Sequence, residues 1–73
     1  MKLINHIDTI RLSKNMSVED VALESDIKPS TLFKIRSQQS VPSILTALSI
    51  AKTLNTPIEK VFEVVEWTTI WLV

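Results

Sequence analysis

The sequence predicts an all-α domain of five helices, with a short β element formed by its two ends. Apolar residues recur at helical spacing through most of the chain, and each such segment follows a residue that commonly begins a helix. The last ten residues are instead β-branched and aromatic, which favours a strand. A chain of 73 residues without cysteine forms one small domain, which helix packing and association must stabilise.

The first two expected helices are short. The first begins at Asn5, a good N-cap, and runs to about Lys14. The second follows Ser17, and Asp20 three residues later gives a variant of the capping box. The expected apolar sides consist of Ile7, Ile10 and Leu12 in the first helix, and of Val18, Val21, Ala22 and Leu23 in the second.

Prolines begin the next two helices. Pro29 suits the first turn of a third helix that ends near Arg36, and Pro42 with Ser43 begins a longer fourth helix. Thr56 is expected to cap a short fifth helix. The residues expected to face the core are Leu32 and Ile35, then Ile44, Leu45, Leu48, Ala51 and Leu54, then Ile58, Val61 and Phe62.

The C-terminal segment, residues 64–73, is predicted to be a strand, and residues 2–4 could pair with it. We therefore divide the chain into a helical domain, residues 1–63, and an apolar tail that provides dimerisation. Trp67 and Trp71 fall on one face of a strand. The expected dimer interface is Trp67, Ile70, Trp71 and Leu72, and packing of the tail onto its own helices is the alternative.

Charge is segregated along a chain whose net charge is zero. Between positions 27 and 58 there is no Asp or Glu, whereas Lys28, Lys34, Arg36 and Lys52 all lie there. A basic face can therefore exist on a neutral protein. The chain has one His and no glycine, and no catalytic or metal-binding constellation is visible, so we expect no enzyme, cofactor or metal site. No signal peptide or membrane span is visible, so we expect a cytoplasmic protein without membrane contact.

Residues 18–36 have the layout of a helix-turn-helix, in which two short helices meet at a tight turn. The second helix of such a unit enters the major groove of DNA and needs short or flexible hydrogen-bonding side chains there. In the third helix, Ser30, Thr31, Phe33 and Lys34 are spaced to face outward.

Two runs resemble the Cro/C1-type (xenobiotic response element) family. They are SVEDVALESDIKPSTLFKI at 17–35 and the run at 41–62, which fits P-S-x-x-x-A-x-x-I-A-x-x-L-N-x-P-I-E-x-V-F. The ending is similar to that of small stand-alone regulators of Gram-positive bacteria and their phages. The resemblance covers residues 4–63. It implies a lambda-repressor-like fold and a transcription regulator, a repressor or Cro-like switch, that binds a palindromic operator in double-stranded DNA as a homodimer.

The resemblance also implies a set of DNA contacts. Ser30, Thr31 and Lys34 would contact base edges, although a solvated helix face is the alternative. Phe33 would touch a thymine methyl group, or lie in the core or a dimer contact. The expected phosphate contacts are Lys28 and Arg36, together with Ser40 and Ser43 at the start of the fourth helix, where simple N-capping would also explain Ser43.

Three positions depart from the family pattern. Val18 replaces a common Gln, Asp26 replaces the glycine of the turn, and Arg36 replaces an acid that pairs with the arginine found here as Arg11. We therefore expect Arg11 to be partly exposed or to pair elsewhere, with Glu24 or Asp26 as candidates. On this view Arg36→Glu would be tolerated.

Two other functions are alternatives, and the neutral charge, Val18 and the aromatic tail favour the first of them. One is a protein-interaction modulator or anti-repressor with a degenerate helix-turn-helix, whose apolar tail binds another regulator. The other is an antitoxin, whose tail neutralises a toxin.

Overall fold

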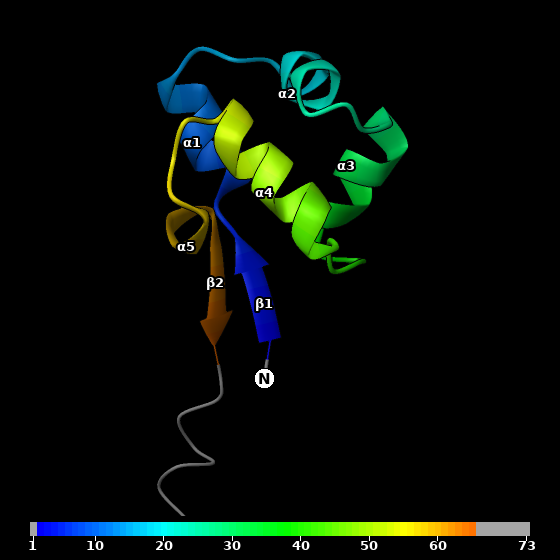
Figure 1. The fold of residues 1–73 in the computed structure, drawn as a ribbon, viewed down its shortest axis with the longest axis vertical. Coiled ribbons are helices and arrows are strands. Elements are labelled where there is room, and N and C mark those ends of the chain that lie inside the picture. Colours follow the sequence, from blue (N-terminus) through cyan, green and yellow to red (C-terminus); the bar gives the residue numbers. More distant parts are fainter. Residues whose placement is uncertain (1, 66–73) are drawn as a thin grey trace, which may run out of the picture.

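Five helices and one two-stranded sheet make up the part of the chain that the structure, a computed structural model, describes, residues 2–65 (Figure 1). Their order is β1 (Lys2–Asn5), α1 (Ile7–Ser13), α2 (Val18–Glu24), α3 (Pro29–Arg36), α4 (Ile44–Thr53), α5 (Ile58–Val61) and β2 (Phe62–Val65). The predicted helices are all present. The predicted short β element is present as well, so the term all-α is slightly loose for this helical domain with a small sheet.

The sheet joins the two ends of the described chain. β1 and β2 are antiparallel, and Lys2 lies opposite Val65 while Asn5 lies opposite Phe62. The predicted partner of the C-terminal strand is therefore right, but β2 begins at Phe62, two residues earlier than expected. Both strands extend away from the helices (Figure 1). The tail residues assigned to dimerisation, Trp67, Ile70, Trp71 and Leu72, lie outside the described residues.

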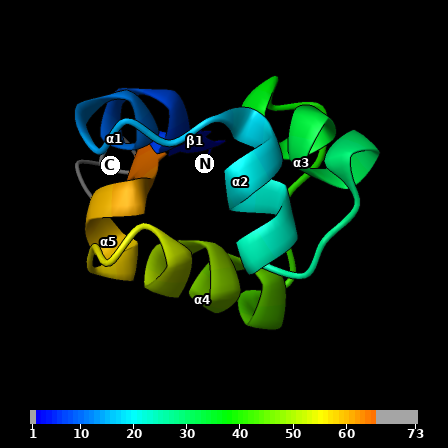
Figure 2. The same cartoon turned by 90° about the horizontal axis from the view of Figure 1, so that it is seen from above.

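The core draws at least one fully buried side chain from every helix. These are Ile7 from α1, Val21 from α2, Leu32 from α3, Ile50 from α4 and Val61 from α5, together with Leu54 just after α4. Burying a side chain of this size stabilises the fold by roughly 1.5–3 kcal/mol. Seen from above, the helices surround this core (Figure 2).

The apolar pattern of α4 was assigned correctly for Ala51 and Leu54, which are buried, and wrongly for its other three residues. Ile44, Leu45 and Leu48 were expected in the core but are exposed, at 71%, 74% and 48%. The core face of α4 consists of Ala47, Ile50 and Ala51 and continues to Leu54. This helix carries two apolar stripes, and the one with two alanines is buried because small side chains allow neighbouring helices to approach closely.

Two more expected core residues are also exposed. Leu12 on α1 is 62% exposed and Leu23 on α2 is 80% exposed. Each of these helices has only seven residues, which limits the number of side chains that can reach the core. The buried residue of α1 is Ile7, and those of α2 are Val21 and Ala22. Ile10 on α1 and Val18 on α2 pack against the core while partly buried, so Leu12 and Leu23 are the side chains that face away from it.

The caps follow the sequence prediction at Ser17 and Ser43 and depart from it in two places. Ser17 and Asp20 form a capping box at the start of α2. Asn5 lies one residue before the N-cap position of α1, although its Oδ1 still accepts a hydrogen bond from the Ile7 N–H at 3.2 Å. Thr56 does not cap α5: its hydroxyl donates to the Leu54 carbonyl at 2.8 Å, and Pro57 holds the N-cap position.

Four residues with a left-handed backbone end the first four helices. They are Asn15, Asp26, Gln38 and Asn55, with φ between 49° and 63°. Glycine is the usual residue at such positions, but the chain contains none. Asn and Asp tolerate this conformation better than other residues, whereas Gln has no such advantage. None of the helices in residues 2–65 is long and apolar enough to span a membrane.

Candidate nucleic-acid interface

The turn between α2 and α3 fixes the angle of α3. Asp26 has φ of 57° and takes the place expected for the glycine of the turn. Lys28 is the N-cap residue of α3 and Pro29 occupies its first turn. Behind the turn, the buried Ser25 hydroxyl donates to Thr53 Oγ1 at 2.9 Å, which ties the end of α2 to α4.

The outward face of α3 carries the predicted contact residues. Leu32 and Ile35 are buried, as expected, while Ser30, Thr31, Phe33 and Lys34 are all exposed. Phe33 is 56% exposed, which rules out the core among the three roles considered for it. Short hydroxyl side chains and one lysine therefore lie together on an accessible helix face.

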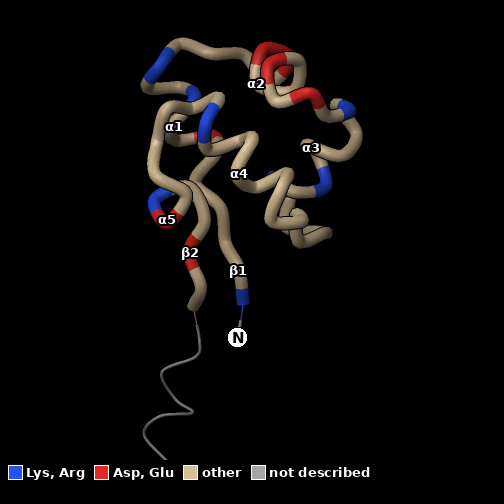
Figure 3. Tube along the Cα trace, viewed as in Figure 1, with Lys and Arg blue, Asp and Glu red and all other residues tan. Residues whose placement is uncertain are grey.

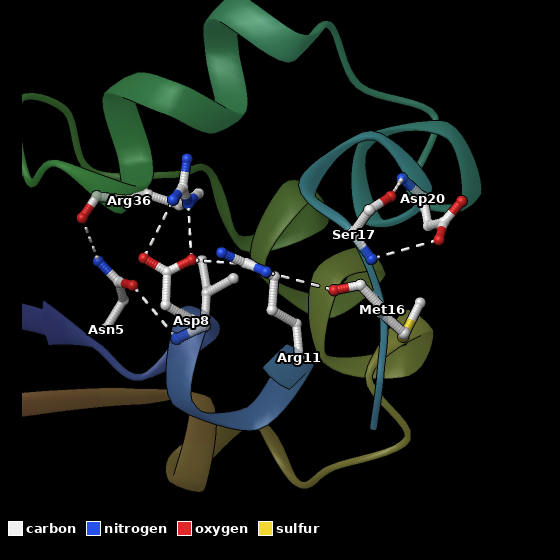
Figure 4. Close-up of polar contacts among 8 residues, drawn as sticks. Asn5, Asp8, Arg11, Met16, Ser17, Asp20 and Arg36 are labelled. Atoms are coloured by element: carbon white, nitrogen blue, oxygen red, sulfur yellow. Dashed lines mark hydrogen bonds and ion pairs between the residues drawn. The ribbon is translucent and has the colours of Figure 1, made fainter. Parts of the chain in front are cut away.

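The C-terminal end of α3 is held by an ion pair to α1 (Figure 4). Arg36 Nε donates to Asp8 Oδ1 at 2.8 Å and its Nη2 donates to Asp8 Oδ2 at 3.1 Å. Arg11 Nε donates to the same Asp8 Oδ1 at 2.8 Å. One carboxylate thus receives both guanidinium groups, and bidentate pairs of this kind fix orientation as well as contributing energy.

The electrostatics of this cluster favour the charged carboxylate. The hydrogen bond from Arg36 lowers the pKa of Asp8 below its ordinary value, and Arg11 lowers it further, while partial burial opposes both. The Asp8 side chain is 47% exposed, whereas those of Arg11 and Arg36 are 15% and 22% exposed. Asp8 is therefore an ionised and accessible centre that holds two less accessible cations.

Asn5 supports the same end of α3. Its side-chain Nδ2 donates to the carbonyl of Ile35 at 2.9 Å and to that of Arg36 at 3.2 Å. The last carbonyls of a helix lack partners within the helix, so this amide satisfies groups that would otherwise need water. The sequence analysis did not predict this role of Asn5, nor did it predict that Asp8 pairs with Arg11 and Arg36.

The expected partners of Arg11 were wrong. Arg11 pairs with Asp8 rather than Glu24 or Asp26, and its Nη1 also donates to the Met16 carbonyl at 3.3 Å. The available signal was an acid three residues before Arg11, in the first turn of the same helix. Because Arg36→Glu would place a second carboxylate beside Asp8, the structure removes the basis for expecting that substitution to be tolerated.

The two serines that were expected to contact phosphates make different hydrogen bonds within the protein. Ser43 is the N-cap of α4, where its Oγ accepts from the Thr46 N–H at 3.2 Å and donates to Thr46 Oγ1 at 3.1 Å. Ser40 is exposed in the loop before α4, and its N–H donates to the Lys34 carbonyl at 3.3 Å. Ser43 therefore has a structural role independent of any ligand.

Charged residues are distributed unevenly around the helix-turn-helix (Figure 3). The acids Glu19, Asp20 and Glu24 lie on α2. In contrast, α3 contains no acidic residue, carries Lys34 and is preceded directly by Lys28. Within the helix-turn-helix, the accessible positive charge therefore lies at α3.

A helix-turn-helix family model matches residues 7–61, and the chain belongs to this family, in the Cro/C1-type group that the sequence resembles. The fold is similar to the crystal structure of the restriction-modification controller protein C.AhdI from Aeromonas hydrophila, with a TM-score of 0.70 and 22% identity over 74% of this chain and 82% of that one. No curated protein matches the sequence significantly. Membership of this family makes the chain a DNA-binding transcription regulator.

Proposed function

We propose that the chain is a sequence-specific operator-binding regulator, a repressor or Cro-like switch of bacterial or prophage origin, and that α3 reads the DNA. The observation that carries this proposal is the exposed, acid-free face of α3. Ser30, Thr31 and Lys34 on this face can hydrogen-bond to base edges, and Phe33 can touch a thymine methyl group. Lys28 and the Ser40 loop flank the helix and would contact phosphates.

Arg36 has a different part in this proposal. Its Nε and Nη2 are both bonded to Asp8, so a phosphate contact would compete with an existing bidentate pair. We assign Arg36 to holding α3 at its angle to α1. Ser43 caps α4 and contributes to binding by ordering the start of that helix.

The regulator would act as a homodimer on a palindrome. Two copies related by a two-fold axis present two α3 helices, and half-sites one helical turn apart match such a pair. A neutral chain gains little from nonspecific attraction to phosphates, so two base-reading helices would provide most of its selectivity.

Selection of bound sequences from random duplex DNA, at a fixed and stated salt concentration, tests the proposal. We expect enrichment of a palindrome with two half-sites. The second candidate is a modulator that binds another protein, which is favoured by the exposed apolar residues on α4. Absence of any enriched sequence, in a chain shown to be folded by circular dichroism, would support the modulator instead.

A further inference from the structure

A strip of exposed apolar side chains extends from the loop before α4 along one side of that helix. Val41, Ile44, Leu45 and Leu48 are 74%, 71%, 74% and 48% exposed. Ile44, Leu45 and Leu48 occupy helical positions i, i+1 and i+4 and lie along one side of α4, whereas Val41 precedes the helix in the loop. The core uses Ala47, Ile50 and Ala51 of α4, so the side chains of this α4 strip do not contribute to the core.

The α4 strip begins beside the sheet. Ser40 and Pro42, on either side of Val41, line a small pocket together with Leu3 and Ile4 of β1 and Phe62 of β2. In Figure 1, the N-terminal end of α4 is the end nearer the strands, and the helix runs from there towards the other helices. The beginning of the strip therefore lies beside the start of β2.

Eight residues follow Val65 in the sequence, and they include Trp67, Ile70, Trp71, Leu72 and Val73. Eight extended residues reach roughly 26 Å, whereas the helical part of the strip, from residue 44 to residue 48, is about 6 Å long. The segment is thus long enough to cover the strip, and it offers matching apolar chemistry.

We propose that the α4 strip is the docking site for residues 67–73 of a second copy of the chain, exchanged reciprocally between the two copies. This inference rests on the homodimer proposed above and names the surfaces that form it. β2 carries the chain away from its own helices (Figure 1), so docking on a second copy requires no reversal of direction, whereas docking on the same copy does.

The area needed for a stable dimer also favours this arrangement. Four exposed side chains give an apolar patch of a few hundred Å², which is less than the roughly 800 Å² that each partner buries in a typical stable complex. An interface formed only by the two α4 strips would therefore bury too little area for a stable dimer. Two tryptophans add roughly 150–250 Å² each to the buried area. In a reciprocal exchange each copy contributes one strip and one tail, so the dimer contains two such contacts.

Both tryptophans of the protein lie in the proposed docking segment, so intrinsic fluorescence reports on that segment alone. We expect the wild-type chain to sediment as a dimer, with an emission maximum that moves to longer wavelength on dilution. Ile44→Asn with Leu45→Asn should shift the emission to that of solvated tryptophan and weaken dimerisation roughly ten- to hundredfold. The control Leu12→Asn, at an exposed leucine on α1, should change neither.

A mixing experiment separates exchange from docking within one chain. The full-length acceptor carries Trp67→Ala and Trp71→Ala and keeps its strip, while the donor carries the two asparagines and keeps its tryptophans. Titrating the donor with the acceptor should return donor emission to shorter wavelength and produce a heterodimer. A wild-type emission maximum independent of concentration, or no response on mixing, would overturn the proposal. None of these measurements uses DNA, so failure here leaves the operator-binding proposal to its own test.

Discussion

Arg36 and Asp8 form a bidentate ion pair across 28 residues of sequence, with Nε–Oδ1 and Nη2–Oδ2 distances of 2.8 and 3.1 Å. The pair connects the last turn of α3 to the first turn of α1. Arg11 shares the same carboxylate. The orientation of the helix proposed to read DNA is therefore coupled to a single acid on α1.

Reversing the charge of Arg36 should destabilise the fold. Arg36→Glu replaces the bidentate pair with two adjacent carboxylates, and we expect a loss of about 1–3 kcal/mol in the free energy of unfolding. Urea denaturation measures it. In the swapped variant, Asp8→Arg with Arg36→Glu, part of this loss should be recovered. A single variant as stable as wild type would show that the pair is not formed in solution.

The stability contributed by Asp8 should depend on pH. Because the pKa of Asp8 is lowered in the folded state, chiefly by Arg36, its stabilisation is complete above the unfolded pKa of about 4 and is lost as the pH falls through the lower, folded pKa. The difference in urea midpoint between wild type and Asp8→Asn should be largest at neutral pH and should narrow below about pH 4. Glu24→Gln, an exposed acid at the end of α2, is the control. A gap of constant size down to pH 2 would be inconsistent with this assignment.

Gln38→Gly should stabilise the protein. Gln38 has φ of 63°, a conformation that costs an ordinary residue roughly 1–2 kcal/mol and glycine almost nothing. After the greater flexibility of glycine in the unfolded chain is subtracted, we expect a gain of about 1 kcal/mol, measured by thermal unfolding. The neighbour Gln39 does not have a positive φ, so Gln39→Gly should give no gain. Equal effects of the two substitutions would argue against strain at Gln38.

Lys34 and Thr31 should affect DNA binding without affecting stability. If Thr31 contacts a base edge, Thr31→Ala should cost roughly 1–3 kcal/mol of operator affinity and relax selectivity at one position. Lys34→Ala should weaken operator binding by a comparable amount. Lys60→Ala removes an equal charge from α5 and is the control. The assay is fluorescence anisotropy with operator and scrambled duplex. Unchanged affinity in both α3 variants would exclude α3 as the reading helix.

How well the sequence predicted each feature depended on whether the cause was local. Ser17 with Asp20 specified a capping box because both partners lie within one helical turn. Pro29 marked the start of α3 for the same reason. The outward set on α3 was also predictable, since the burial of Leu32 and Ile35 determines which residues face away.

The remaining features depended on contacts between distant segments. Apolar spacing alone could not show which stripe of α4 faces the core, because both stripes are helical and only packing against the other helices selects the alanine face. Asp8 acquired two arginine partners because the fold brings α1 beside the end of α3. The sequence by itself determined the helices, the caps at Ser17 and Ser43, and the family. The tertiary structure decided which apolar face remained exposed and which charges were paired, because both depend on neighbours remote in the chain.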